Sequence, residues 1–357
     1  MVQQYQSTPE LFEEVSNILS SYPVGSLKEV VHIREGDMND NWLVETDKGK
    51  YFLKRRNTVF NPDSIDFVLK LVEHILSKGF RTPRLIHTTE GALNVSAEGR
   101  YWELYEYISG DSFQVDNFVQ IESAARLLAR FHIISSSFQA RAEAVPNRKI
   151  DLDGFAVMIG QLKNLVNVEL KKSTLGSLLH PRVMNFIDAQ AEIVLNGIQP
   201  LSGNPITITH GDFQPSNIIF RGNEVAALVD FDNAVFSYRS YDMAKAILSF
   251  SSLRQDYENQ NDMDPRMDWN RVKAFFGAYQ EEMPLTEKEI VAIPALIRGA
   301  FLFSVAFYMS KKSGLASKVR LLIYALRFFR WFDGSEAELR GILLQDRQVL
   351  RERFKRE

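Results

Sequence analysis

The first third of the chain has the hydrophobic pattern of short strands. Five runs of apolar and β-branched residues, each bounded by polar residues, are Glu29–Ile33, Trp42–Glu45, Lys50–Lys54, Leu93–Val95 and Trp102–Ile108. The short polar turns between the first three runs predict an antiparallel meander. Two amphipathic helices are predicted beside it, one within residues 1–27 and one that begins at Asn61 and ends at Gly79.

Beyond Gly110 the apolar residues recur mainly at helical spacing. The predicted helical stretches are Phe118–Ser135, a long segment from Asp153 to Gly197, Tyr241–Phe250, Trp269–Glu282, Glu287–Ser310 and Lys318–Phe332. Three short strand-like runs interrupt them at Ile206–Ile208, Asn217–Phe220 and Ala226–Asp230. The pattern therefore predicts three parts: an N-terminal helical segment over residues 1–27, a strand-rich region over 28–108 and a mainly helical region over 109–357.

The composition is that of a soluble globular protein. The 357 residues carry 42 basic and 45 acidic side chains, a net charge of −3, and 45% of them are hydrophobic, which argues against disorder and against a nucleic-acid-binding tail. The absence of cysteine excludes disulfides, thiolate zinc sites and a cysteine nucleophile. No basic residue precedes Lys28, so a signal peptide is not expected. The expected location is the cytoplasm.

Two segments invite a membrane or nucleic-acid interpretation, and neither is favoured. The uncharged stretch Gly299–Ser310 is shorter than the roughly 20 residues that a spanning helix needs, so a buried helix is expected. Bases and aromatic residues alternate in Lys318–Arg330, but its apolar residues fall on one helical face, which favours a helix packed on the core. No membrane partner and no nucleic-acid partner is therefore expected.

The densest chemistry lies in the loops around the late strand-like runs. Asp212 and Asn217 stand five residues apart after an apolar run, and Asp230 ends a further apolar run. Phosphoryl transfer from a nucleotide needs a carboxylate that orients the attacking hydroxyl and hard oxygen ligands for Mg²⁺. An Asp, an Asn at +5 and a later strand-ending Asp supply these groups in the order of the protein-kinase catalytic loop and metal-binding Asp.

The first part of the chain contains matching candidates for nucleotide binding. Lys54 ends the third strand-like run, where a kinase lysine contacts the α- and β-phosphates. The turn that includes Gly36, Asn39 and Asn41 joins the first two runs, so its backbone N–H groups could contact phosphates. The segment from Glu106 to Ile108 lies where strands give way to helices, the position of a hinge that offers the Glu106 carbonyl and the Ile108 N–H to a nucleotide base.

These motifs resemble one known family. His210-Gly-Asp-x4-Asn217, Val229-Asp-Phe-Asp232, Lys54, the turn at residues 36–41 and Tyr241-Asp-Met-Ala244 together are similar to the aminoglycoside phosphotransferase and choline kinase family. The turn Gly36–Trp42 and the segment Leu285–Gly299 are most similar to its homoserine-kinase-like branch, and the likeness covers about residues 28–310.

The resemblance implies a fold and a set of roles. The fold is α+β and protein-kinase-like, with a small antiparallel-sheet N-lobe, a larger mainly helical C-lobe, and ATP or GTP held between them. In these terms Asp212 is the catalytic base, Asn217 and Asp230 hold Mg²⁺, and Lys54 binds the phosphates. The expected enzyme moves the γ-phosphate to a hydroxyl of a small molecule: an amino alcohol, a homoserine-like compound, an aminosugar or an aminoglycoside.

Several positions depart from the family pattern. Gln214 stands where many members have His, Asp232 replaces the protein-kinase Gly, and Asp37 and Asp40 put negative charge in the phosphate turn. The acidic partner of Lys54 stays open between Glu73 and Asp66. The acidic segment 251–270 would suit a cationic substrate, although such loops are commonly only solvated.

Alternative interpretations accompany the main residues. Asp212, Asn217 and Asp230 could be turn or capping residues, and Lys54 could be an exposed strand-end lysine like Arg55 and Arg56. His210 is expected to brace the loop by hydrogen bonds and not to act as acid or base. Asp242 is interpreted as the N-cap of a helix that begins at Met243 or as a brace for the loop.

Two other function classes remain as alternatives. The first is a kinase-shaped binding or structural protein without turnover, similar to spore-coat members of the same broad family, which the acidic turn at Asp37 and Asp40 would suit. The second is a protein kinase, disfavoured because no Ala-Pro-Glu element follows Asp230 before the helix at Tyr241. The sequence leaves open the acceptor, the nucleotide base and the oligomeric state.

Overall fold

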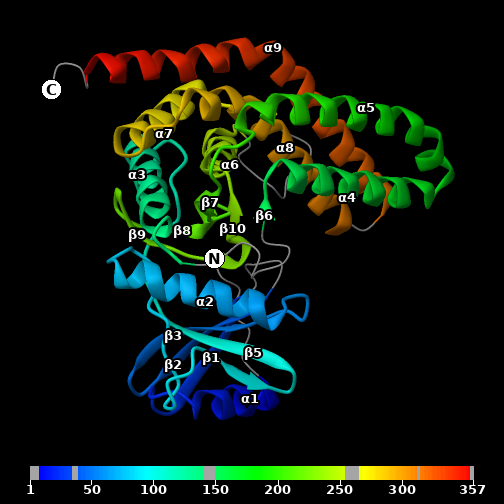
Figure 1. The fold of residues 1–357 in the computed structure, drawn as a ribbon. Coiled ribbons are helices and arrows are strands. Elements are labelled where there is room, and N and C mark those ends of the chain that lie inside the picture. Colours follow the sequence, from blue (N-terminus) through cyan, green and yellow to red (C-terminus); the bar gives the residue numbers. More distant parts are fainter. Residues whose placement is uncertain (1–7, 34–38, 140–148, 254–264, 312–313, 354–357) are drawn as a thin grey trace. The chain divides into compact units, whose positions relative to one another are not determined.

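The computed structural model describes residues 8–33, 39–139, 149–253, 265–311 and 314–353 (Figure 1). The chain divides into two compact units, which are described separately. Unit 1 comprises residues 1–112, 138–145 and 218–232, and unit 2 comprises residues 113–137, 146–217 and 233–357. Unit 1 therefore takes a late segment of the chain, and this segment brings Asp230 and Asp232 to the same unit as Lys54.

Unit 1 is built on a five-stranded antiparallel sheet with the strand order β1-β2-β3-β5-β4. Its strands are β1 (Leu27–Ile33), β2 (Asp40–Thr46), β3 (Gly49–Arg55), β4 (Val95–Ala97) and β5 (Arg100–Glu106), and β8 (Ile218–Arg221) pairs with β9 (Glu224–Leu228) in a separate hairpin. The meander β1-β2-β3 confirms the alternation in the sequence. The predicted run Leu93–Val95 is wrong in position, because the turn at Glu98 and Gly99 sets the register that pairs Val95 with Trp102.

Two helices cover the opposite faces of this sheet. Helices α1 (Pro9–Leu19) and α2 (Pro62–Ser77) each begin at a capping residue, Thr8 and Asn61, with Pro in the first turn. Along β5, Trp102 and Leu104 join the core that contains α1, while Tyr101 and Tyr105 join the core that contains α2. Since strand side chains alternate, Glu103 lies on the α2 face of the sheet.

Unit 2 is mainly helical and contains one small sheet. Its helices are α3 (Phe118–Ser135), α4 (Leu152–Lys171), α5 (Thr174–Ile198), α6 (Arg239–Ser251), α7 (Trp269–Glu282), α8 (Glu287–Lys311) and α9 (Leu315–Arg353). The strands β6 (Lys149–Ile150), β10 (Val235–Ser237) and β7 (Thr207–Thr209) form a three-stranded sheet in that order. Helix α8 contacts α4, α5, α6 and α9, so it is the central helix of the unit.

The helical predictions are confirmed for α3, α6, α7 and α8, with end points that differ by at most two residues, and two other segments need correction. The segment Asp153–Gly197 is two helices, because Ser173 interrupts it and caps α5 by accepting a hydrogen bond from the Gly176 N–H. The predicted last helix, Lys318–Phe332, is the first part of a longer helix that continues to Arg353. Its apolar face is buried as predicted, and Phe328 stacks on Phe301 of α8 with ring centroids 3.8 Å apart.

Helix α8 is long and apolar enough to cross a membrane by length and composition alone, with a mean hydropathy of 2.1. In the structure, 72% of the most apolar 18-residue stretch of this helix is buried inside the protein. Arg298, in the middle of the helix, is buried and paired with Asp333 and Glu336 of α9. These contacts are those of a core helix, as expected for the stretch Gly299–Ser310.

Candidate functional site

Lys54 is buried on unit 1, unlike an exposed strand-end lysine. It lies on β3 between Asn41 of β2 and Glu103 of β5 and is 7% exposed. Its Nζ donates to Asp230 Oδ1 at 3.2 Å and to both carboxylate oxygens of Asp232 at 3.1 Å. Burial disfavours the ammonium charge, but the Asp230 and Asp232 carboxylates outweigh burial and raise the pKa of Lys54 above its usual value.

A second basic residue, Arg56, shares the carboxylate of Asp232. Arg56 is 2% exposed, so the expectation that it is exposed like Arg55 is wrong. Its guanidinium forms a two-pronged ion pair with Glu103, at 2.5 Å and 3.0 Å, and it also contacts Asp232. The tyrosine hydroxyl of Tyr105 donates to Glu103 at 2.8 Å. Unit 1 therefore holds a cluster in which two cations, Lys54 and Arg56, alternate with three carboxylates.

Neither candidate carboxylate on α2 is the partner of Lys54. Asp66 pairs with Lys70 at 2.6 Å on the exposed side of the helix, and Glu73 pairs with His87 at 3.1 Å. The carboxylates that reach Lys54 come from the segment that follows β9.

The phosphate-turn candidates are only partly described. Gly36 and Asp37 lie outside the described residues. Asn39 donates through Nδ2 to Asp232 and accepts from the Asn57 N–H at 2.9 Å, while Asn41 is buried opposite Lys54. The charge of Asp40 is paired with Arg55, whose Nη2 lies 2.9 Å from Asp40 Oδ2, so Asp40 adds little unpaired negative charge to this turn.

The hinge candidates follow the end of β5. The strand ends at Glu106 and not at Ile108 as predicted, and the Glu106 N–H donates to the Arg84 carbonyl at 2.9 Å. Glu106 is exposed and Ile108 is partly exposed. Their contribution to nucleotide binding therefore stays a prediction.

Asp230 has a backbone conformation that side chains rarely adopt. Its φ is +65°, and Asp230 and Glu98 are the two non-glycine residues with positive φ among those the structure describes. This conformation costs about 1–3 kcal/mol, and such strain is concentrated at functional sites. The Asp230 side chain is 41% exposed while its Oδ1 binds Lys54, so the carboxylate can bind a further cation.

The loop after β7 gathers polar groups around Asp212 in unit 2. Asn217 Nδ2 donates to Asp212 Oδ2 at 3.1 Å and to the Asp212 carbonyl at 2.8 Å, and Gln214 Nε2 donates to Oδ2 at 3.0 Å. Lys245 of α6 lies 3.5 Å from Asp212 Oδ1. Asp212 and Asn217 are therefore brought together, as are Lys54 and Asp230 in unit 1.

Asp242 braces this loop from below. Both of its carboxylate oxygens accept backbone N–H groups, from His210 at 2.6 Å and Gly211 at 2.9 Å, and Oδ2 also contacts His132 Nε2 at 3.1 Å. Helix α6 begins at Arg239 with Tyr238 as its N-cap, so the N-cap interpretation of Asp242 is wrong and the brace interpretation agrees with the contacts. His210 is likewise buried, and its Nδ1 accepts from the Asp212 N–H at 3.3 Å.

The brace predicts a stability change in acid. Burial opposes ionisation of Asp242, but its hydrogen bond with His132, its electrostatic interactions with His132 and His210 and the hydrogen bond from the Gly211 N–H outweigh burial and lower the pKa of Asp242. A carboxylate with a lowered pKa in the folded state stabilises the protein above its unfolded pKa of about 4, and this contribution is lost as the pH falls below that value. We expect Asp242→Asn to cost about 3–5 kcal/mol near neutral pH and to flatten the acid dependence of urea unfolding. An unchanged acid slope in the variant would contradict this role.

Gly211 is required by both conformation and space. Its φ is +74°, and a Cβ atom there would lie 2.0 Å from the Asn233 carbonyl oxygen. Gly203 has nearly the same φ, +75°, with no atom within 4 Å of a Cβ. We expect Gly211→Ala to displace the loop and lower turnover on the order of 100-fold, whereas Gly203→Ala shows only the backbone cost in thermal unfolding. Equal turnover in the two variants would show that the Asn233 contact is unimportant.

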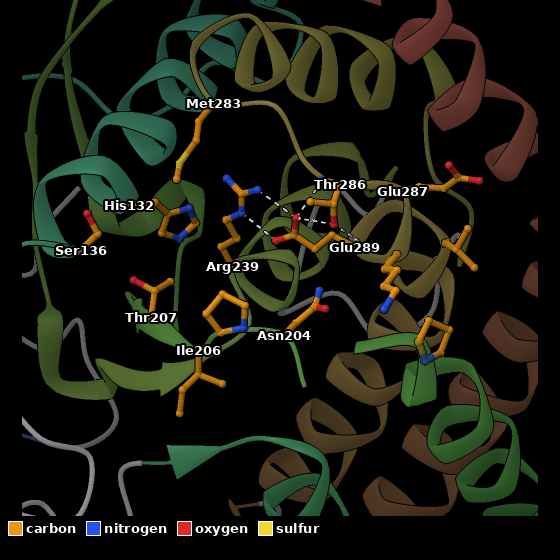
Figure 2. Close-up of a pocket in the computed structure, with 14 residues that line it drawn as sticks. His132, Ser136, Asn204, Ile206, Thr207, Arg239, Met283, Thr286, Glu287 and Glu289 are labelled. Carbon is orange, nitrogen blue, oxygen red and sulfur yellow. Dashed lines mark hydrogen bonds and ion pairs between the residues drawn. The ribbon is translucent and has the colours of Figure 1, made fainter. Parts of the chain in front are cut away.

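Unit 2 also contains a cavity of about 1030 Å³, and its wall includes His132, the residue that contacts Asp242. Figure 2 shows His132 of α3, Thr207 of β7, Arg239 of α6 and Glu289 of α8 around it. Arg239 binds Glu289 through two hydrogen bonds of 2.6 Å and 2.9 Å, and Glu289 also caps α8 by accepting the Thr286 N–H. Arg239 and Glu289 satisfy each other's charge and join α6 to α8, and His132 belongs both to the cavity wall and to the contacts of Asp242.

Each unit offers one candidate oxygen ligand for a hard divalent cation. Because Asn217 Nδ2 is turned toward Asp212, its Oδ1 is the side-chain atom left for a metal, and Asp230 supplies a partly exposed carboxylate. The described part of the chain contains no group of three His, Cys, Asp or Glu residues that could hold a metal. Mg²⁺ commonly takes only one or two protein ligands together with phosphates and water, so Asn217 in unit 2 and Asp230 in unit 1 each carry an oxygen of the kind that Mg²⁺ binds.

Sequence reasoning missed three residues of these clusters: Glu103, Arg56 and Lys245. Glu103 was detectable as a charged residue between the apolar Trp102 and Leu104 in the middle of a strand. Lys245 follows the Tyr241-Asp-Met-Ala motif by one residue, but only the fold shows that α6 directs it at Asp212.

Comparison with known proteins identifies the family. The sequence model of the "Phosphotransferase enzyme family" matches residues 29–275, well over half of the chain. The chain belongs to this phosphotransferase family. It is also 25% identical over 291 residues to a homoserine kinase of Rhodopseudomonas palustris, with 81% of each chain covered.

Solved structures show the same fold. The structure resembles an aminoglycoside phosphotransferase from Alicyclobacillus acidocaldarius, with a TM-score of 0.62, 18% identity and 98% of both chains covered. It also resembles an amicoumacin kinase in complex with AMP-PNP and Ca²⁺, with a TM-score of 0.65, 12% identity and coverage of 90% and 93%. The α+β, protein-kinase-like fold that the motifs implied is thus confirmed.

Proposed function

We propose that this phosphotransferase moves the γ-phosphate of ATP to the hydroxyl of a small amino alcohol, with Mg²⁺. The observation that carries the proposal is the pair Asp212 and Asn217, spaced as in a kinase catalytic loop and joined at 3.1 Å. The homoserine kinase relative and the aminoglycoside phosphotransferase neighbour are named for substrates that carry both an amine and a hydroxyl. ATP is favoured as donor because the amicoumacin kinase was solved with an ATP analogue.

The proposal gives each of these residues a role. Asp212 orients the acceptor hydroxyl and takes its proton as the hydroxyl oxygen attacks the γ-phosphorus. The bond between that phosphorus and the β–γ bridging oxygen breaks at the same time, and ADP leaves. Gln214, Asn217 and Lys245 fix the Asp212 carboxylate. Lys54 binds the phosphates, and Asn217 and Asp230 would hold Mg²⁺, which neutralises phosphate charge when bound.

The proposal also covers the residues around the nucleotide and the compartment in which the enzyme works. Asn39 and Asn41, together with Gly36, which lies outside the described residues, would form the turn over the phosphates. Glu106 and Ile108 would contact the base. Use of ATP suits a cytoplasmic enzyme, and the absence of cysteine is compatible with a reducing compartment. The acidic segment that would favour a cationic acceptor is mostly outside the described residues.

Two linked measurements test the proposal. In thermal unfolding, Mg·ATP at about 100 times its dissociation constant should stabilise the protein by about 2.7 kcal/mol, with Mg·GTP as a parallel sample. Nucleotide consumption is then screened against homoserine, simple amino alcohols, aminosugars and aminoglycosides. No shift with either nucleotide would favour a binding protein without turnover, and a shift without acceptor-dependent consumption would show that the acceptor class is wrong.

A further inference from the structure

We propose that Lys54 is positioned by Asp232, which Arg56 and Glu103 hold in place, and not by a carboxylate of helix α2. This rests on the proposed role of Lys54 in binding the phosphates. In protein kinases the equivalent lysine pairs with a glutamate of the αC helix, and movement of that helix makes or breaks the pair. The question for this chain is therefore which carboxylate holds Lys54.

The contacts of Lys54 point to Asp232. Both Asp232 oxygens lie 3.1 Å from Lys54 Nζ, and the two side chains are 6% and 9% exposed. Asp230 makes a single contact at 3.2 Å and is 41% exposed. A buried, two-oxygen contact constrains the direction of the ammonium group more than a single exposed contact.

The two carboxylates of α2 are directed elsewhere. Asp66 pairs with Lys70 one turn along the same helix, and both side chains are more than half exposed. Glu73 pairs with His87, with 36% of the Glu73 side chain exposed. Either residue would have to leave its present partner to reach Lys54.

Asp232 is itself held from several directions. Arg56 contacts it from the end of β3, and Asn39 donates to it from the start of β2. Arg56 is held in turn by Glu103, whose side chain is 0% exposed and lies on the central strand β5. The chain Glu103–Arg56–Asp232–Lys54 therefore links buried side chains of β3, β5 and the segments that follow β3 and β9, and α2 contributes no member.

The consequence is a lysine that is positioned without the helix. Because its partners come from the sheet and from the segment after β9, the orientation of Lys54 does not depend on where α2 lies. Asp232 is a positioning residue in this account: it acts through Lys54 and does not itself contact the phosphates.

The test compares nucleotide binding in three variants of the full chain. Dissociation constants for Mg·ATP are measured by titration calorimetry for Asp232→Asn, Lys54→Met and the pair combined. We expect Asp232→Asn to weaken binding at least about tenfold, since a charge-assisted contact is lost. We expect the combined variant to bind no more than about twofold worse than Lys54→Met, because both changes remove one interaction. A merely structural role of Asp232 would make the two losses additive.

The matched control is the double variant Asp66→Asn/Glu73→Gln, which changes exposed residues and should fold normally. We expect its dissociation constant to stay within about twofold of the wild type. A tenfold loss in this control, or wild-type binding in Asp232→Asn, would overturn the inference, and the control decides alone if Asp232→Asn does not fold. Failure of the wild type to bind any nucleotide would instead contradict the proposed function.

Discussion

Replacing Asp212 by Asn is expected to lower kcat roughly 10²–10⁴-fold while nucleotide binding is kept, since this is the usual effect of losing a general base. The amide preserves the size of the side chain and can still accept hydrogen bonds from Gln214 and Asn217, which now lie within 3.1 Å of Asp212 Oδ2. The measurement is steady-state turnover of an identified acceptor, together with calorimetric titration of Mg·ATP.

The matched control for Asp212 is Asp188→Asn in the same unit. Asp188 pairs with Lys163 and its side chain is 51% exposed, so the change should leave kcat within about twofold of the wild type. Turnover of Asp212→Asn at the wild-type rate would contradict the assignment of the base.

Replacing Asp230 by Ala is expected to abolish measurable binding of Mg·ATP. The variant removes a proposed metal ligand and one of the carboxylates that contact Lys54. It also removes a side chain from a backbone position with a φ of +65°, which alanine tolerates no better. Binding is followed by calorimetry with Mg²⁺ present and with the metal chelated.

Two comparisons separate metal binding from stability in the Asp230 variant. Glu224→Ala removes a carboxylate that is 78% exposed in the same unit and should bind nucleotide like the wild type. Wild-type binding should depend on Mg²⁺, and Asp230→Ala should show no measurable binding with Mg²⁺ present or chelated. If the variant binds Mg·ATP and the affinity still rises with Mg²⁺, Asp230 is not the ligand.

The sequence predicted the elements of the fold because their patterns are local. The β1-β2-β3 meander follows from alternation and short turns, and α3 and α7 follow from helical spacing with capping residues at Asn117 and Asp268. The break at Ser173 was missed, since apolar residues continue at helical spacing on both sides of it. The two-residue strand β6 and the short β10 carry too few residues to show a period.

In the candidate site, too, the sequence predicted the residues of a local motif and missed the contacts between distant residues. The order of Asp212, Asn217 and Asp230 is visible in a single sequence because the spacing within the loop is fixed by the turn chemistry. The partner of Lys54 could not be predicted from the sequence, because it depends on which distant residues meet in the fold: Asp232 is 178 positions from Lys54. Arg56 looked like one of three exposed bases, and only the folded structure shows that it is buried and paired with Glu103.

The most direct test of the account is the product formed by the wild-type protein with Mg·ATP and the acceptor panel. Phosphorus NMR and mass spectrometry of the reaction should show one new phosphate monoester on an acceptor oxygen, formed in equal amount with ADP. The Asp212→Asn protein should form it at least about 100 times more slowly. A wild-type protein that binds Mg·ATP but phosphorylates none of the amino alcohols would contradict the claim that this chain transfers phosphate to such a hydroxyl.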